Sequence, residues 1–502
     1  MESFISKVVS KFKIDDLDES HFILPSRRAA QAFSKQLFQN QTESFLVPPI
    51  QSIEEFIESV ARVKLITSLE TIFYFYEVYK DCTHPDKQEP LEQVYTWGQS
   101  ILQDFNEIDR YQIDADQFFG NLKAIKDIEH WSKSDVKTDL VKNYIEFWES
   151  LPIYYHELKN VLKSQNKAYQ GMAYQEAVLN IEKFINSTNK HYYFIGFNAL
   201  NTCEENIFQH VVKQKRGKVF WDIDNYLLKE HSAGMFMRSY SKNWPIYSDK
   251  KLQPSTYSYS ENKNINLYGV PKKIGQAKLV GDLVSNMTQK ELSKTAIVLG
   301  DESLLQPVLN SLPNNISEVN VTMGLPLAST NPASLFDTIF KIRTLNQQDL
   351  HYKTLFELIE HPSLKKAYQK ELQSIKKNIN DHNIVFQLKE DFFQRNSIDS
   401  ALLKILKLSI NTIDISVDEF LDNCLEIIEL LRPNFHDDKL SLEYLFGFKK
   451  LFIRLKNLLN KTELINEFKV FHQIYLDIQI HNPHYKLYPL ILKPYEFFLL
   501  CL

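Results

Sequence analysis

The sequence lacks the glycines that mark a nucleotide-binding loop. A phosphate loop needs two glycines separated by four residues, then Lys and Ser or Thr, so that backbone amides wrap the phosphates. The 502 residues include only 12 glycines, and the single Gly-Lys pair, Gly217-Lys218, is followed by Val219 and preceded by no suitable glycine. We therefore expect no tight binding or hydrolysis of ATP by this chain.

Paired metal-binding or disulfide-forming residues are also missing. The four cysteines are isolated, and the 14 histidines show no zincin spacing. Neither pattern suits a zinc site, an iron–sulfur cluster or a disulfide framework. No Gly-x-Ser-x-Gly elbow is present either, so a serine hydrolase is unsupported. We expect this chain to hold no cofactor.

Long apolar runs are absent as well. No stretch of about 20 apolar residues occurs, and residues 1–12 are amphipathic without the apolar core of a signal peptide. Isolated thiols are typical of a reducing compartment. These features predict a cytoplasmic protein without membrane contact.

The composition points to helices and to several domains. The chain has 34 Phe and 25 Tyr against 12 Gly, which favours a loop-poor, mostly helical protein, and its length predicts roughly three or four domains. The net charge is -5 and the pI about 6.3. Any nucleic-acid surface must therefore be a local groove.

The segment from His21 to Phe33 predicts a buried strand that runs directly into a helix. Its apolar run ends at Pro25, Ser26 can cap the helix, and the apolar residues that follow have helical spacing. Arg27 and Arg28 then lie in the first helical turn at the carboxyl edge of a sheet, where open α/β sheets bind ligands and where a phosphate backbone fits. From this segment alone, a solvated arginine pair at an ordinary strand-to-helix turn is the favoured interpretation.

Other segments predict further α/β structure. We expect a capping-box helix from Ser52 and strands at residues 192–195, 218–224, 264–268 and 295–300. Residues 68–177 and most residues beyond 333 have helical periodicity.

Three groups of acidic residues are candidates for metal binding. Two of them have the residue types of a metal-dependent nuclease site but lack flanking apolar strands: Asp86 with Asp135-Val136-Lys137, and Asp437-Asp438-Lys439. Asp222 and Asp224 point to one face of a strand end, where turn and cap roles are the favoured interpretation over a metal site. We therefore expect no nuclease activity from this chain alone.

Five ordered blocks resemble the amino-terminal part of the AddB/RecB-like PD-(D/E)XK nuclease family, in the form common in the Bacteroidetes. The resemblance covers about residues 1–480. The blocks are Phe22–Ala30, Trp97-Gly98 with Asp104–Asp109, Phe194–Asn201, Val219–Asp224 and Asn320–Leu327.

This resemblance implies an α/β fold with large helical insertions, similar to superfamily I helicases, with RecA-like parallel sheets and mostly helical overall. The implied parts are residues 1–64 and 185–258 as helicase-like domain 1A, 65–184 as insertion 1B, 259–345 as helicase-like domain 2A, 346–480 as insertion 2B, and 481–502 as an atypical tail. Arg27 and Arg28, with Ser26 as a weaker candidate, would occupy the place of the helicase motif that touches the single-stranded DNA backbone.

The implied role is to bind and guide DNA ends within a helicase–nuclease repair complex, beside an AddA/UvrD-like helicase subunit. Full-length family members carry a later nuclease domain that needs Mg²⁺ and acts as an exodeoxyribonuclease. The proline-broken apolar tail departs from the family pattern, and we interpret it as a truncation or frameshift. Two alternatives remain: a fragment of a full-length nuclease whose catalytic domain is missing, or a structural partner of a helicase that does not bind DNA.

Overall fold

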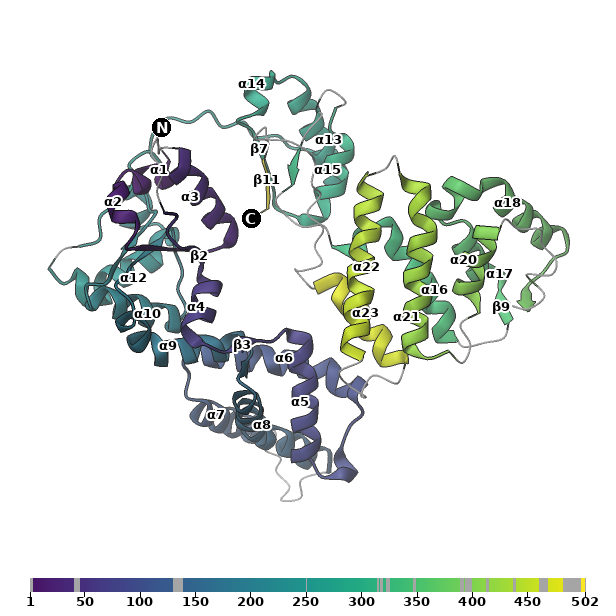
Figure 1. The fold of residues 1–502 in the computed structure, drawn as a ribbon, viewed down its shortest axis with the longest axis horizontal. Coiled ribbons are helices and arrows are strands. Elements are labelled where there is room, and N and C mark those ends of the chain that lie inside the picture. The colour runs from purple at the N-terminus through teal and green to yellow at the C-terminus, as the bar shows by residue number, and fades with distance from the viewer. Residues whose placement is uncertain are drawn as a thin grey trace. The chain divides into compact units, whose positions relative to one another are not determined.

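The structure is a computed structural model of the chain. It describes residues 3–39, 46–129, 139–249, 251–313, 316, 319–321, 326–345, 349–388, 392, 400–411, 415–436, 439–459, 468–481 and 498–501. The chain divides into two compact units, residues 1–265 and residues 266–502 (Figure 1). Most described residues are helical, and the first unit contains a four-stranded parallel sheet. An α/β fold with large helical insertions is thereby confirmed.

The sheet of the first unit has the strand order β2-β1-β5-β6, and all its pairs are parallel. Its strands are β1 (Ser20–Leu24), β2 (Ile50–Ser52), β5 (His191–Ile195) and β6 (Gly217–Phe220). Because β2 lies on one side of β1 and β5 on the other, the chain reverses its direction of winding at β1. Ligands of open parallel sheets bind at the carboxyl ends of the strands at such a switch point.

The helices of the first unit fall into a group around the sheet and a group inserted between β3 (Lys64–Leu65) and β4 (Lys167–Ala168). Around the sheet lie α1 (Phe4–Val9), α2 (Ile14–Leu17), α3 (Arg27–Gln39), α4 (Ile53–Ala61), α9 (Gln170–Asn186), α10 (Thr202–Lys213), α11 (Asn225–Lys229), η2 (Ser232–Gly234), α12 (Met235–Asn243) and η3 (Pro245–Tyr247). The insertion holds α5 (Ser68–Cys82), η1 (Pro85–Lys87), α6 (Leu91–Arg110), α7 (Ala115–Glu129) and α8 (Asp139–Ser164).

Strand β1 lies at the centre of an aromatic core. All five of its residues are buried, and the Phe22 ring lies 4.9 Å from the Phe12 ring and 4.9 Å from the Phe33 ring of α3. Ala30 and Leu37 of α3 are buried beside them. The apolar run therefore forms a buried strand, and the residues at helical spacing form the buried face of α3, as predicted.

Helix α9 contacts the insertion as well as the sheet helices. It packs on α4 and α10 and also on α6. At the α6 contact a Cβ on Gly171 would lie 2.3 Å from the carbonyl oxygen of Asn106, and the Gly171 amide donates to the Asn106 side chain over 2.6 Å. Only glycine fits this close backbone approach.

The second unit combines a small sheet with a helical bundle. Its elements are α13 (Lys272–Ser285), α14 (Gln289–Leu292), β7 (Ala296–Leu299), η4 (Glu302–Leu304), α15 (Leu305–Ser311), β8 (Asn320–Val321), η5 (Leu327–Ser329), α16 (Asn331–Leu345), β9 (Asp349–His351), α17 (Tyr352–Ile359), α18 (Pro362–Asp381), β10 (Phe386–Leu388), α20 (Ser400–Ile410), α21 (Val417–Leu431), η6 (Arg432–Phe435), α22 (Lys439–Leu459), α23 (Phe468–His481) and β11 (Phe498–Cys501). The parallel sheet has the order β7-β11-β8. In the bundle, Phe340 of α16 stacks on Tyr475 of α23 with 3.9 Å between ring centroids.

The prediction of a strand at residues 264–268 is wrong. These residues form no strand in the structure, and Ile265 and Leu267 are 73% and 93% exposed. Among the described strands, the neighbour of β7 is β11. The segment therefore has neither the pairing nor the burial that stabilises a strand.

No described helix combines the length and the apolar character needed to cross a membrane.

We predict that Gly171→Ala lowers the free energy of unfolding of the first unit by about 1–3 kcal/mol, because the new methyl group would overlap the Asn106 carbonyl. All five tryptophans lie before residue 265, so tryptophan fluorescence during urea denaturation reports on this unit. Gly120→Ala in α7 is the control, because nothing lies within 4 Å of its Cβ position. It should be neutral or stabilising by up to about 1 kcal/mol. Equal effects of the two substitutions would contradict the packing argument.

Candidate nucleic-acid interface

Ser26 caps α3 at the carboxyl end of β1. The Ala29 amide donates to the Ser26 hydroxyl oxygen over 3.2 Å, and the Ala30 amide donates to the Ser26 carbonyl over 3.0 Å. Ser26, Arg27 and Arg28 are all exposed. The expected strand-to-helix turn is therefore confirmed, and both arginines open a helix at the edge of the sheet.

Arg27 is held by a carboxylate from the neighbouring strand end. Its Nε lies 2.8 Å from an oxygen of Glu55, while the Arg27 side chain stays 75% exposed. The other oxygen of Glu55 accepts from the amide and the hydroxyl of Ser52, which completes a capping box on α4. Burial alone would raise the pKa of Glu55, but the hydrogen bonds from Ser52 and the Arg27 charge hold that pKa below its ordinary value.

The turn after β5 has a left-handed glycine and a capped helix. Gly196 has a φ of 76°, and Asn201 and Glu204 form a capping box at the start of α10. A Cβ on Gly196 would lie 3.6 Å from the Phe4 ring of α1. Helix α1 therefore lies next to this strand end.

The two aspartates after β6 accept hydrogen bonds from backbone amides and from hydroxyl groups of the following loop. Asp224 accepts from the Tyr226 amide over 2.9 Å, from the Tyr259 amide over 3.1 Å and from the Thr256 hydroxyl over 2.9 Å. Burial would raise the pKa of Asp224, but these hydrogen bonds outweigh it and lower the pKa. Asp222 accepts from the Ser255 hydroxyl. Their interpretation as turn and cap carboxylates is confirmed.

The other acidic candidates do not form a site. Asp86 lies in the exposed turn η1 with a side chain that is 88% exposed. Asp135-Val136-Lys137 and Asp437-Asp438 lie outside the described residues. Within the part of the chain that the structure describes, no group of three or more His, Cys, Asp or Glu residues could hold a metal ion.

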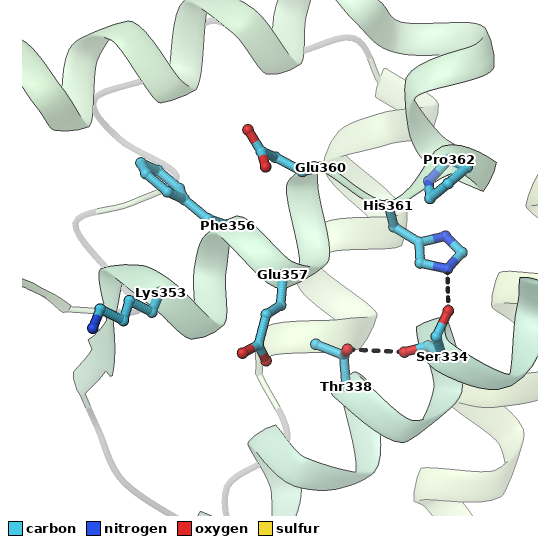
Figure 2. Close-up of a pocket in the computed structure, with 8 residues that line it drawn as sticks. All are labelled: Ser334, Thr338, Lys353, Phe356, Glu357, Glu360, His361 and Pro362. Carbon is cyan, nitrogen blue, oxygen red and sulfur yellow. Dashed lines mark hydrogen bonds between the residues drawn. The ribbon is translucent and has the colours of Figure 1, made fainter.

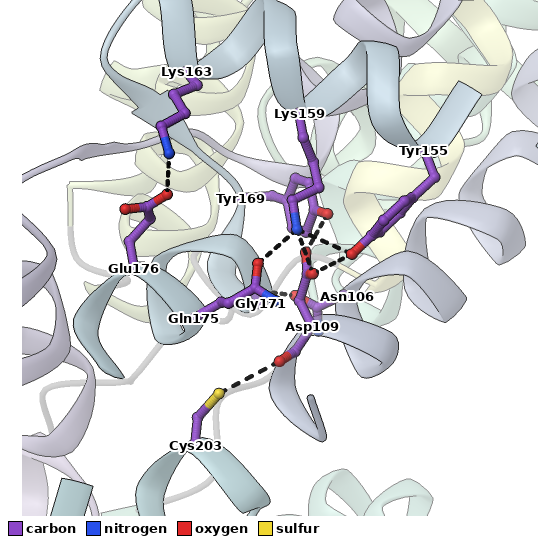
Figure 3. Close-up of polar contacts among 10 residues, drawn as sticks. All are labelled: Asn106, Asp109, Tyr155, Lys159, Lys163, Tyr169, Gly171, Gln175, Glu176 and Cys203. Atoms are coloured by element: carbon purple, nitrogen blue, oxygen red, sulfur yellow. Dashed lines mark hydrogen bonds and ion pairs between the residues drawn. The ribbon is translucent and has the colours of Figure 1, made fainter. Parts of the chain in front are cut away.

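A buried carboxylate joins the insertion to the sheet helices (Figure 3). Asp109, at the end of α6, is fully buried. Its carboxylate accepts from Tyr155 over 2.5 Å and from Tyr169, and it pairs with Lys159 over 2.7 Å. Its backbone carbonyl accepts from the Cys203 thiol of α10 over 3.4 Å. Burial and the Asp109 charge raise the pKa values of Tyr155 and Tyr169, so both phenols stay protonated donors.

A second polar link runs parallel to the first. The Arg110 guanidinium lies 5.5 Å from the centroid of the Tyr174 ring, and the Tyr174 hydroxyl donates to Glu204 over 3.4 Å. Burial raises the pKa of Glu204. The last turn of α6 is therefore linked through Tyr174 of α9 to the first turn of α10, the helix that follows β5 in the chain.

The second unit contains an open pocket of about 490 Å³, lined by Ser334, Thr338, Lys353, Phe356, Glu357, Glu360, His361 and Pro362 (Figure 2). His361 Nε2 lies 2.8 Å from the Ser334 hydroxyl, a distance that resembles a nucleophile and its base. However, His361 Nδ1 accepts from the Ser363 amide, so Nε2 carries the proton and donates. The Ser334 hydroxyl donates to the Asn331 carbonyl. This histidine caps α18 and cannot activate the serine.

Sequence reasoning missed the Arg27–Glu55 pair and the Asp109 network. The first had half a signal: Ser52-x-x-Glu55 marks a helix start, but the contact also depends on the pairing of β1 with β2, which the pattern does not give. The second had none, since Asp109, Lys159 and Tyr169 are distant in the sequence and share no spacing rule.

Comparison with known proteins finds no match for the chain among family models or curated protein sequences.

We predict that Asp109→Ala lowers the free energy of unfolding of the first unit by about 3 kcal/mol. The substitution removes the charge partner of Lys159 and the acceptor of two buried tyrosine hydroxyls. Asp116→Ala is the control: it breaks an exposed contact with His156 and should change stability by less than about 0.5 kcal/mol. Urea denaturation followed by tryptophan fluorescence measures both. A mild effect of Asp109→Ala would show that water replaces the missing carboxylate.

We also predict that alkylation of the native protein modifies Cys82 much faster than Cys203 or Cys424. Cys82 is exposed and the other two are buried. Burial raises the pKa of Cys203 to about 12 and raises that of Cys424, and the thiolate is the reactive form. Mass spectrometry of the labelled peptides gives the three rates, with denatured protein as the control. Fast labelling of Cys203 would mean that α10 opens from the Asp109 network.

Proposed function

We propose that this chain binds DNA ends and guides a single strand as a scaffold within a helicase–nuclease repair complex. One observation carries the proposal: Arg27 and Arg28 are exposed at the first turn of α3, at the carboxyl edge of a parallel sheet. Helix amides and guanidinium groups together suit a phosphate backbone. The resemblance to the AddB/RecB-like family supports the same contact.

The Arg27–Glu55 pair is compatible with phosphate binding. A guanidinium carries five N–H donors in a planar fork, and Glu55 engages Nε. With three-quarters of the side chain exposed, the terminal nitrogens remain accessible from solvent. A phosphate would bind there beside the carboxylate, and its affinity would be reduced by the negative charge of Glu55.

The remaining parts of the proposal rest on the family resemblance. They are the superfamily I helicase-like architecture, the AddA/UvrD-like partner subunit, the cytoplasmic location, and a Mg²⁺-dependent nuclease activity that belongs to full-length relatives. In this proposal the present chain binds DNA and performs neither ATP hydrolysis nor phosphodiester cleavage.

We predict that Arg27→Ala/Arg28→Ala weakens binding to a labelled single-stranded oligonucleotide, because the substitution removes both positive charges that would contact the DNA phosphates. The slope of log affinity against log salt should fall by about 0.7 for each phosphate that the variant no longer neutralises. Fluorescence anisotropy at several salt concentrations measures affinity and slope, and circular dichroism checks folding. Lys183→Ala/Lys213→Ala is the charge-matched control, because these exposed lysines lie in the last turns of α9 and α10.

A single substitution at Glu55 sharpens this test. Glu55→Gln keeps an oxygen for the capping box but removes the charge that competes for Arg27, so it should tighten binding. If the wild type does not bind DNA, or if the folded arginine variant binds with unchanged affinity and slope, the proposal is wrong. Absence of DNA binding by the wild type would favour the alternative, a structural partner of a helicase.

A further inference from the structure

Two tyrosines beyond β6 stack on each other at the protein surface. Tyr226 lies in α11 and Tyr259 in the loop that follows η3. Their ring centroids are 5.1 Å apart at an interplanar angle of 20°. Tyr226 remains 50% exposed and Tyr259 49% exposed. The pair therefore presents aromatic surface to solvent.

One buried carboxylate fixes both tyrosines. Asp224 is only 8% exposed, and one of its oxygens accepts from the Tyr226 amide while the other accepts from the Tyr259 amide. Two segments more than 30 residues apart are thereby anchored to the same side chain. Because the backbone of both residues is already ordered, little conformational entropy remains to be lost when a ligand stacks on the rings.

The surroundings of the pair suit a polyanion that places a base, and not a phosphate, next to Asp222. Lys263 Nζ lies 4.9 Å from the centroid of the Tyr259 ring, and Lys7 Nζ donates to the carbonyl of Ser255 in the same loop over 3.3 Å. These cations suit a polyanionic ligand. The exposed carboxylate of Asp222 opposes a phosphate placed directly at this strand end, whereas an aromatic ring attracts the π face of a base.

The segment that carries Tyr226 follows the carboxyl end of β6, and the arginines follow the carboxyl end of β1 at the same edge of the sheet. Strands β1 and β6 are parallel and separated only by β5, so they are about 10 Å apart at a strand spacing of 4.7–4.9 Å. The carboxyl end of β1 presents Arg27 and Arg28, and the carboxyl end of β6 leads into Asp224 and Tyr226. A short oligonucleotide can span both.

We propose that Tyr226 and Tyr259 form a stacking platform for the bases of single-stranded DNA, while Arg27 and Arg28 bind its phosphates. This inference rests on the proposed function and adds a second, chemically different contact. Stacking on aromatic side chains tolerates any base, so the platform would bind strands without sequence preference, as a subunit that guides DNA ends requires.

The test compares two oligonucleotides of equal length and charge, a polythymidine and an abasic strand that keeps only sugars and phosphates. Fluorescence anisotropy should show that the wild-type chain binds polythymidine more tightly than the abasic strand. Tyr226→Ala/Tyr259→Ala should lose this preference and weaken polythymidine binding about 5-fold or more. Tyr226→Phe/Tyr259→Phe keeps the rings and should bind like the wild type. Tyr111→Ala removes an equally exposed tyrosine, 48%, at the end of α6 and should have no effect.

The outcomes separate the inference from the proposed function. The arginine double variant should bind both strands more weakly but keep the preference for polythymidine. If the wild type binds both strands equally, or if the folded tyrosine variant binds like the wild type, the stacking inference is wrong while DNA binding stands. If the wild type binds neither strand, both proposals are wrong. Self-association that the tyrosine variant alone abolishes, with unchanged DNA binding, would instead assign the pair to a contact between protein chains.

Discussion

The carboxylate of Asp109 is the constraint on which the first unit depends. A buried carboxylate must be paired and hydrogen-bonded, because its desolvation costs several kcal/mol. Its three partners come from α8 and from the start of the α9 segment, so α6, α8 and α9 have a single compatible register. The backbone carbonyl of Asp109 also accepts from Cys203. Since Cys203 lies in the first turn of α10, and α10 follows β5, the helical insertion fixes the position of a strand end in the sheet.

Most polar side chains at the carboxyl edge of the sheet accept hydrogen bonds from backbone amides at the starts of helices. Ser26 caps α3, Ser52 and Glu55 cap α4, Asn201 and Glu204 cap α10, and Asp224 caps α11. Each of these side chains accepts a hydrogen bond from a backbone amide, and among the residues that the structure describes the carboxylates do not assemble into a metal site. The exposed groups near these strand ends include two cations, Arg27 and Arg28, and two aromatic rings, Tyr226 and Tyr259, besides the carboxylate of Asp222. That combination suits a polyanion with flat bases.

Local patterns of the sequence predicted local structure well. Three features could be predicted because each depends on neighbours within a few residues: the strand at residues 22–24, the Ser26 cap and the capping box at Ser52. The Arg27–Glu55 pair required knowledge that β1 and β2 are adjacent, and the Asp109 network required contacts between residues 46 to 60 positions apart. The prediction of a strand at residues 264–268 was wrong because strand pairing is a tertiary event that the local sequence does not specify. The domain boundaries and the helicase-like architecture remain predictions of the family resemblance.

Under the proposed function, the Arg27–Glu55 pair has a mechanistic meaning. With a net charge of -5, the chain attracts DNA through local groups only, so the strength of each contact matters. An arginine that already pairs with a carboxylate binds a phosphate beside that carboxylate, so the net gain is smaller than for an unpaired cation. A guide for a moving strand needs contacts of this kind, because each phosphate must leave as readily as it enters. The engaged arginine therefore suits a sliding track better than a static clamp.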